Sequence, residues 1–278
     1  MTHRRDTPLA WAEALLRAHR RLALRYCTAR SLRVERKPDH SPVTDADRAL
    51  EERFRRAIAR AFPQDGILGE EFGRVKPEAS AYWTIDPIDG TRAFTRGLPT
   101  WGMLLARVER GTPVVGACDF PALRIFVGAA GPQAYERTED GRRPLPRARP
   151  PRRLADAVLF HGGSRWWLGT RYAAGMTRLV RGCFLERSYG DCYAYLWVLR
   201  GRADAMIDFG VKPWDLAPFA ALARATGRVV THADGRPGFD GPDSIFAHPR
   251  TQRWIVRALA PSARPHHLSA DRTAGRRR

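Results

Sequence analysis

The segment Trp83–Phe94, WTIDPIDGTRAF, joins an apolar run to a turn that carries two carboxylates. The run AYWTI is typical of a strand, and Pro87 lacks a backbone donor, so strand pairing is expected to end there. Asp86 and Asp89 then stand on one turn, where their side chains can converge on one point. With the carbonyl of Ile88 pointing the same way, these oxygens suit Mg²⁺, which prefers carboxylates, water and substrate phosphate.

The two residues after this turn favour an anion. The backbone N–H groups of Gly90 and Thr91 can form an anion-binding nest, and a helix that begins there would add its positive end. An Asp-x-x-Asp turn alone is a weak signal, because an ordinary capped turn has the same composition. The other acidic segments of the chain strengthen it.

Three further acidic segments stand at the ends of expected elements in this otherwise basic chain. Asp45 and Asp47 lie in SPVTDAD, Glu70 and Glu71 in ILGEEFG, and Asp215 in KPWDLAPF. Asp215 stands where a helix is expected to start, so a plain helix cap would also explain it. Acidic segments that each end an element together predict one multinuclear Mg²⁺ site.

Apolar periodicity outlines the elements around these segments. Helices are expected over residues 8–30 and 46–62, followed by strands in AYWTI, GMLLARV, PVVGACDF and RIFVGAA. The Pro- and Arg-rich stretch 141–153 is typical of an exposed, extended linker. The second half alternates strands in DAVLF, CFLE, DAMIDF, RVVTH and DSIFAH with helices over residues 166–180, 191–199, 216–225 and 250–259.

This order of elements predicts an α+β fold built from layered sheets and helices. We expect an N-terminal α+β subdomain over residues 1–145, which carries most metal ligands. A C-terminal α/β subdomain over residues 146–260 would hold the substrate pocket. The remainder, 261–278, has almost no apolar content and is expected to be a disordered basic tail.

Composition narrows the function classes. The 278 residues include 48 Lys and Arg and 29 Asp and Glu, a net charge of +19. The arginines are scattered among acids without a nucleic-acid-binding motif, so a compositional bias is favoured and a non-catalytic nucleic-acid-binding protein is the distant alternative. No apolar run could span a membrane, and the charged first twenty residues lack a signal peptide's apolar region. Four cysteines without a CxxC pair fit the cytoplasm.

The four acidic motifs together resemble the inositol monophosphatase superfamily of Mg²⁺-dependent, lithium-sensitive phosphatases. Its paired signatures stand here as Asp86–Thr91 and Trp214–Ala217, with Gly-Glu-Glu at Gly69–Glu71 and P-V-T-x-x-D at Pro42–Asp47. Their order and spacing match from about residue 8 to 258. The resemblance implies the layered αβαβα sandwich of the inositol monophosphatase and fructose-1,6-bisphosphatase type, two or three Mg²⁺ ions, and a homodimer.

The resemblance also implies roles for individual residues. The metal ligands would be the side chains of Glu70, Asp86, Asp89 and Asp215 and the carbonyl of Ile88, with Asp86 bridging two ions. Glu70, Asp47 and Thr91 would orient the attacking water. Lys37 and Glu71 would support these residues from behind, and the phosphate would be held by Gly90, Thr91 and Arg92.

Within the superfamily, the chain looks most like the histidinol-phosphatase branch. The runs DGTRAFTRGLPTWGMLLA and YGDCYAYLWVLRGRADAMIDFGVKPWDLAP carry this likeness, with the K-x-D-x-S-P-V-T-x-A-D pattern of Lys37–Asp47. It implies hydrolysis of L-histidinol phosphate to L-histidinol and phosphate by a metal-activated water. An inositol-1-phosphate or 3′-phosphoadenosine phosphate phosphatase is the alternative. The substrate pocket would be lined by Arg187, Gly190, Asp191, Cys192, Asp208 and Asp215.

Three of the pocket assignments have plain structural alternatives. Asp191 or Asp208 could pair with a substrate amine, because a cation favours a carboxylate partner. A helix cap would equally explain Asp191, and a surface position would explain Asp208. Trp101 could stack on an imidazole ring, although a core position is the more common place for a tryptophan.

Overall fold

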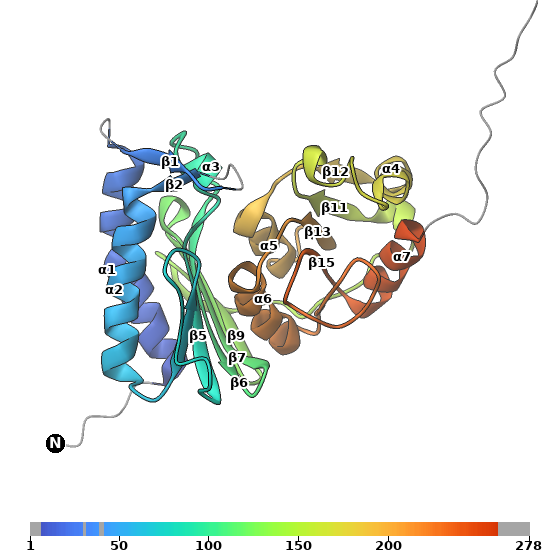
Figure 1. Cartoon of the computed structure of the whole chain (residues 1–278). Coiled ribbons are helices and arrows are strands. Elements are labelled where there is room, and N and C mark those ends of the chain that lie inside the picture. Colours follow the sequence, from blue (N-terminus) through green and yellow to red (C-terminus); the bar gives the residue numbers. More distant parts are fainter. Residues whose placement is uncertain (1–6, 30–31, 39–41, 261–278) are drawn as a thin grey trace, which may run out of the picture.

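The computed structural model describes residues 7–29, 32–38 and 42–260. Figure 1 shows helices, a sheet, a second pair of helices, a second sheet and a last pair of helices in succession across the molecule. This is the expected αβαβα sandwich. The basic tail expected over residues 261–278 lies outside the described residues. No helix in the described ranges is long and apolar enough to cross a membrane.

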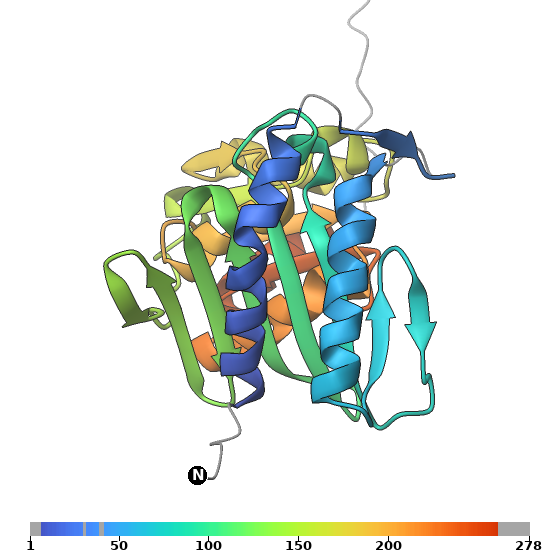
Figure 2. The ribbon, with the colours of Figure 1, turned by 90° about the vertical axis from the view of Figure 1, so that its left-hand side faces the viewer.

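The first layer consists of α1 (Pro8–Cys27) and α2 (Asp45–Ala61), which lie across the outer face of the first sheet (Figure 2). Their apolar faces contribute the fully buried side chains Leu16, Leu50 and Phe54 to the core. The Thr44 side chain caps α2 and accepts hydrogen bonds from backbone N–H groups of its first turn. The helix therefore begins close to the position that the sequence predicts.

The first sheet has eight strands in the order β10-β9-β8-β7-β6-β5-β3-β4. Most neighbours are antiparallel, and β3 and β5 are parallel. A separate pair, β1 (Val34–Arg36) and β2 (Pro42–Thr44), precedes α2. The strands of the large sheet are β3 (Gly66–Gly69), β4 (Gly73–Val75), β5 (Ala81–Asp89), β6 (Gly102–Glu109), β7 (Thr112–Phe120), β8 (Ile125–Ala130), β9 (Gln133–Thr138) and β10 (Gly141–Pro144).

The middle layer is formed by α5 (Asp191–Leu199) and α6 (Pro213–Thr226). Both helices are apolar on nearly every side, as expected for helices covered by a sheet on each face (Figure 1). The helix α6 comes unusually close to β7, because a Cβ atom on Gly116 would stand 2.2 Å from the carbonyl oxygen of Pro218. Glycine at this position therefore lets the helix backbone contact the sheet.

The second sheet has the order β12-β11-β13-β15-β14. Its strands are β11 (Val158–His161), β12 (Leu185–Arg187), β13 (Ala205–Phe209), β14 (Val229–Thr231) and β15 (Asp243–Ala247). Helices α4 (Ala173–Gly182) and α7 (Pro249–Leu259) form the last layer. The remaining short elements are α3 (Thr91–Phe94), η1 (Pro121–Leu123), η2 (Leu154–Asp156) and η3 (Ser164–Trp166).

Part of the stretch 141–153, which we expected to be an extended linker, forms a strand instead. Its first residues, Gly141–Pro144, form the edge strand β10, which pairs with β9, a strand that the sequence pattern also missed. Proline and arginine are compatible with an edge strand, where one side of the ladder faces water. The composition therefore hid a strand that has only one partner.

Three element boundaries also differ from expectation. The helix expected over 166–180 begins only at Ala173, because residues 167–172 form turns in which Trp167 and Tyr172 pack into the core. The strand expected in CFLE begins at Leu185. Strand β5 continues beyond Pro87 to Asp89, with an irregularity in its pairing between Asp86 and Asp89. The division into subdomains at residue 145 stays a prediction.

Candidate active site

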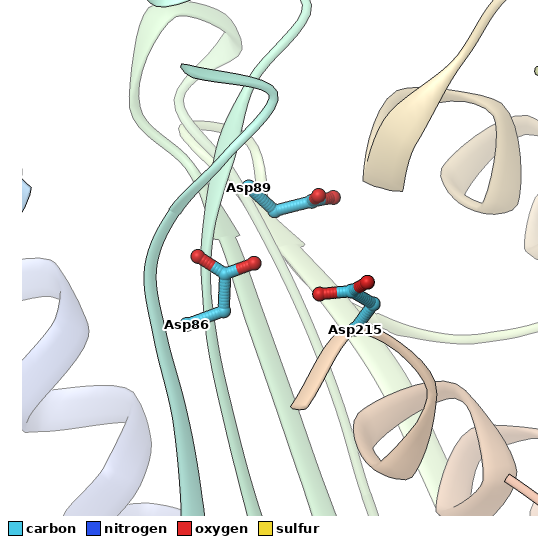
Figure 3. Close-up of side chains that lie close together, drawn as sticks. All are labelled: Asp86, Asp89 and Asp215. Carbon is cyan, nitrogen blue, oxygen red and sulfur yellow. The ribbon is translucent and has the colours of Figure 1, made fainter. Parts of the chain in front are cut away.

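Three carboxylates converge between the first sheet and the middle helix layer. Asp86, Asp89 and Asp215 each offer an oxygen, and these oxygens all lie within 4.8 Å of one another. Figure 3 shows the first two projecting from the end of β5 toward Asp215 at the start of α6. Asp215 stands more than a hundred positions after Asp86 and Asp89 in the sequence, and the fold brings the three side chains together.

Local structure explains how β5 presents two carboxylates on one side. Its pairing with β6 is interrupted after Asp86 and resumes at Asp89, so the strict alternation of side chains is broken. The backbone N–H of Ile88 donates to Oδ1 of Asp86 at 3.0 Å. The Ile88 side chain itself is fully buried in the core, which fixes the turn from the opposite side.

Asp215 is held by the first turn of α6. Pro213 starts the helix, and Oδ2 of Asp215 accepts the backbone N–H of Lys212 at 2.8 Å. The cap residue is Lys212, so a plain N-cap role for Asp215 is wrong. Asp215 instead occupies the third position and reaches back, which leaves its other oxygen for the carboxylate cluster.

The repulsion among the carboxylates of this cluster favours binding of a cation. Burial raises the pKa of Asp86 well above its usual range, and the charges of Glu70 and Asp89 raise it further. Burial raises the pKa of Asp89, and that of Asp215 to about 8, with further repulsion from neighbouring acids. Like charges held together away from water cost free energy unless they share a counter-ion. The all-oxygen donor set fits a hard divalent cation.

Glu70 and Glu71 lie beside this cluster and share one lysine. Nζ of Lys37 donates to Oε1 of Glu70 and to Oε1 of Glu71, each at 2.7 Å. Burial opposes the charged form of Lys37, but attraction and hydrogen bonds from the two glutamates outweigh it and raise the lysine pKa. Lys37 therefore stays charged and contacts both carboxylates, and its supporting role in catalysis stays a prediction.

A buried glutamate that the sequence analysis missed supports this turn from behind. Glu51 of α2 is fully buried and accepts the backbone N–H of Glu71 at 2.7 Å and that of Phe72 at 3.2 Å. Its charge is paired with Arg55 at 2.7 Å. A Cβ atom on Gly69 would stand 2.0 Å from Oε1 of Glu51, so glycine is required there. The available signal was an acid on the apolar face of α2.

Asp47 and Thr91 form a hydrogen-bonded group beside the turn. Asp47 is fully buried, and its Oδ2 accepts from the backbone N–H of Thr44 at 2.7 Å and from the Thr44 hydroxyl at 2.6 Å. The hydroxyl of Thr91 donates to the carbonyl of Ile88 at 3.0 Å and lies 3.5 Å from Oδ1 of Asp47. Burial raises the pKa of Asp47 to about 7.

The loop after β5 turns sharply at Gly90. This residue has φ +87°, a conformation that favours glycine, and a Cβ atom there would stand 3.0 Å from the carbonyl oxygen of Thr100. The next residues form the single turn α3. Arg92 in this turn lies over the ring of Trp166, 5.2 Å from its centroid, which links the loop to the second half of the chain.

The predicted pocket residues at the start of α5 lie against the carboxylate cluster. Gly190 precedes the helix, and Asp191 is its first residue, with φ +59°. The N–H of Cys192 donates to Oδ2 of Asp89. An N-cap role for Asp191 is wrong, because Gly190 holds that position. Burial raises the pKa of Asp191, and Arg92 opposes this rise.

The remaining pocket candidates differ in their surroundings. Asp208 is 6% exposed in β13, so the alternative of a surface position is wrong. Its pKa is raised by burial and by the charge of Asp191. Arg187 ends β12 and is exposed, with its guanidinium donating to the carbonyl of Glu186 at 2.6 Å. Trp101 is fully buried against Phe94, so a stacking role on a ligand is wrong.

Comparison with known proteins places this geometry in a family. A model of the inositol monophosphatase family matches residues 6–265. The histidinol-phosphatase of Mycobacterium tuberculosis is 36% identical over 218 residues, which are 78% of this chain and 84% of that protein. The histidinol-phosphatase of Chlorobaculum parvum is 32% identical over 241 residues, 86% and 91% of the two chains. The inositol-1-monophosphatase ImpA of Mycolicibacterium smegmatis is 31% identical over 238 residues, 83% and 84%.

Solved structures show the same fold. The extragenic suppressor protein SuhB of Bartonella henselae superposes with a TM-score of 0.82 at 24% identity, covering 91% of this chain and 98% of that chain. The layered α+β sandwich expected from the motifs is therefore confirmed. With a family model that covers nearly the whole chain and close relatives that are phosphatases, this chain belongs to the inositol monophosphatase family and is a phosphoric monoester hydrolase.

Proposed function

We propose that the protein hydrolyses L-histidinol phosphate to L-histidinol and phosphate with Mg²⁺. The observation that carries the metal-dependent part is the cluster of Asp86, which is buried, with Asp89 and Asp215, which are partly buried. The substrate assignment is supported by the greater identity to histidinol-phosphatases than to ImpA. A phosphatase of inositol 1-phosphate is the second candidate, because ImpA aligns over a similar length.

The carboxylate cluster would hold the metal. Glu70, Asp86, Asp89 and Asp215 would supply side-chain oxygens, and Ile88 would supply its carbonyl. When bound there, Mg²⁺ would lower the pKa of a coordinated water, and its positive charge would stabilise negative charge on the phosphate ester. The repulsion among the carboxylates supports this assignment, because a counter-charge would remove it.

Asp47 and Thr91 would orient the attacking water together with Glu70. The Thr91 hydroxyl lies 3.0 Å from the Ile88 carbonyl oxygen and 3.5 Å from Oδ1 of Asp47 and donates its single hydrogen to one of them, so its oxygen keeps a lone pair for another donor. Lys37 holds Glu70 with one oxygen engaged and the other available. Gly90, Thr91 and Arg92 would receive the phosphate, where the loop backbone turns through a left-handed residue.

The organic part of the substrate would lie toward α5 and β13. Asp208 is a buried acid, and its pKa is raised first by burial and then by the charge of Asp191, an exposed acid at the start of α5. An ammonium group between them would relieve this repulsion, and histidinol phosphate carries one whereas inositol 1-phosphate does not. This charge argument favours the amino alcohol ester over the inositol ester. Gly190, Cys192, Asp215 and Arg187 would complete the pocket.

Phosphate release from three esters tests the assignment. L-histidinol phosphate, inositol 1-phosphate and adenosine 3′,5′-bisphosphate would each be assayed with Mg²⁺, with and without EDTA and lithium. Preference for histidinol phosphate, abolished by EDTA, is expected. Preference for another ester would be consistent with the metal site but would overturn the substrate assignment. Turnover that is insensitive to EDTA would overturn the metal-dependent mechanism.

A variant sharpens the substrate test. Asp191→Asn should raise KM for histidinol phosphate by about tenfold or more, because it removes one partner of the ammonium group, while KM for inositol 1-phosphate should change little. Asp156→Asn, which changes an acid in the short helix η2, serves as the matched control. An equal rise in KM for both esters would show that Asp191 does not bind the amine.

The assembly and the cellular location of the protein also stay proposals. We expect a homodimer in the cytoplasm, as the family resemblance and the cysteine content imply. Sedimentation at micromolar concentration would give the mass of the assembly directly, and a monomer would contradict the expectation.

A further inference from the structure

The two middle helices connect the carboxylate cluster to a second, basic cavity. At their N-terminal ends, Asp215 belongs to the cluster and Cys192 contacts Asp89. Near their C-terminal ends lies a cavity of about 630 Å³, lined by Arg147, Arg149, Arg200, Arg202 and Arg228 and by one acid, Asp204. The lengths of α5 and α6 separate the two sites by about 13 to 21 Å at 1.5 Å per residue.

Two of the five arginines have structural partners. Arg200 pairs with Glu136 at 3.0 Å. Arg228 is buried and donates to the carbonyls of Pro146 at 3.2 Å and Val198 at 2.7 Å. These contacts satisfy carbonyls at the end of α5, as basic residues near helix C-termini often do. Helix capping therefore explains this part of the positive charge.

The other three arginines are not explained by the fold. Arg147, Arg149 and Arg202 are exposed, and none donates a side-chain hydrogen bond or forms an ion pair within residues 7–29, 32–38 and 42–260. The single acid, Asp204, is engaged by the backbone N–H of Val158 at 2.8 Å. The cavity therefore has an excess of guanidinium groups directed at solvent.

The positive charge of the arginines affects the pKa of a neighbouring histidine. His248 also lines the cavity, and its pKa is lowered by burial and then by the charges of Arg253, Arg228 and Arg250. Burial also lowers the pKa of Arg228 to about 10. The charge of Asp204 opposes the shift of Arg228, whereas the shift of His248 includes repulsion from the neighbouring arginines. An anionic ligand would relieve the repulsion among these groups.

We propose that this cavity binds a small phosphorylated polyanion. Its volume falls within the range of about 300–1,000 Å³ typical of small-molecule sites. Guanidinium groups match phosphate oxygens with paired hydrogen bonds. The described part of the lining contains no Phe, Tyr or Trp, the side chains on which single-stranded nucleic acids mainly stack. Oligophosphate groups are the chemistry that this lining recognises.

This site is independent of the phosphatase reaction and of its substrate. It also gives a role to the Arg- and Pro-rich stretch 141–153, because Arg147 and Arg149 belong to it. Without metal, the carboxylate cluster carries the opposite charge and should repel a polyanion. Binding measured in EDTA therefore reports on the basic cavity.

Calorimetric titration with inorganic tripolyphosphate in EDTA tests the proposal. The variant Arg147→Gln/Arg149→Gln should lose affinity by about tenfold or more relative to the unaltered protein. The control Arg53→Gln/Arg60→Gln removes the same charge from exposed positions of α2 and should lose less than about twofold. No binding at millimolar tripolyphosphate, or equal losses in the two variants, would overturn the proposal.

Two further measurements keep the outcome decisive. Arg202→Gln changes a different part of the cavity and should also weaken tripolyphosphate binding, so it decides the matter if the double variant does not fold. Circular dichroism reports the fold of each variant. A short single-stranded RNA that binds through these arginines and is not displaced by tripolyphosphate would assign the surface to nucleic acid and overturn the small-ligand proposal.

Discussion

The two ends of the middle helices differ in charge and in how deeply that charge is buried. At the N-terminal ends, three carboxylates with mutually close oxygens lie between the sheet and the helices, and Asp86 is 2% exposed. At the C-terminal ends, arginines gather around an open cavity, and only Arg228 is buried among them. The helix dipoles favour this sorting, because they attract acids at one end and bases at the other.

The difference in burial separates a charge cluster that needs a ligand from one that tolerates water. Exposed arginines are hydrated and cost little free energy when they have no partner. Buried carboxylates without a counter-ion cost much more, and the raised pKa values of Asp86, Asp89 and Asp215 express that cost. The acidic end should therefore depend on its cation, and the basic end should not depend on any ligand for folding.

The largest effect is expected from Asp86→Asn. Loss of this carboxylate should lower kcat by at least about a thousandfold, because in the proposed mechanism Asp86 is a shared ligand of the metal. The same change should raise the melting temperature in EDTA, because it removes one of the repelling charges. Phosphate release and thermal denaturation measure the two effects.

The matched control for this variant is Asp140→Asn, which neutralises an exposed acid in the β9–β10 turn. It should leave kcat and the melting temperature nearly unchanged. Full activity of Asp86→Asn with an unchanged Mg²⁺ requirement would contradict the site assignment.

The metal-free protein should lose stability as the pH rises from 6 to 8. The folded-state pKa of Asp215 is about 8, above its ordinary value of 3.8, so the folded protein retains a proton that the unfolded chain releases. Stability is then complete at low pH and is lost as the pH rises through the folded-state pKa. One such proton corresponds to a loss of about 2 kcal/mol between pH 6 and pH 8.

Thermal denaturation in EDTA at several pH values measures this loss. Added Mg²⁺ should restore more stability at pH 8 than at pH 6, because the ion competes with the proton for the same oxygens. A melting temperature in EDTA that is constant over this range would show that the carboxylates are not coupled in the folded state.

Much of the acidic site could be predicted from sequence because its parts are local. Asp86 and Asp89 share one turn, and Glu70 and Glu71 are adjacent, so short motifs identified them. Their meeting with Asp215 depends on the fold and was expected only because several acidic segments end elements and resemble a known family. Glu51 was missed because its partners are backbone N–H groups that no residue pattern reveals.

The basic cavity could not be predicted, because its lining comes from four separate parts of the chain. Arg147, Arg202 and Arg228 are unremarkable among so many scattered arginines until the fold brings them together. The edge strand β10 was missed for a related reason. An edge strand buries little apolar surface, so its alternation is weak and its proline is tolerated.

A smaller effect is expected from Lys37→Met, at the margin of the acidic end. This change should lower kcat by about ten- to a hundredfold, because Glu70 loses the partner that orients it. Lys37→Arg keeps the charge and should recover part of the activity. Steady-state assays at several Mg²⁺ concentrations separate kcat from metal affinity, and an unchanged kcat would show that Glu70 is oriented without the lysine.

The smallest effect belongs to the basic end, where one arginine is structural and its neighbours are not. Arg228→Met should lower the free energy of unfolding by about 2 kcal/mol, because the carbonyls of Pro146 and Val198 lose their buried donor. Arg202→Gln, in the same cavity but exposed, should change it by less than about 0.5 kcal/mol. Urea denaturation compares the two. Equal destabilisation would mean that the exposed arginines also hold the fold together, and the contrast in burial between the two helix ends would then not predict their contribution to stability.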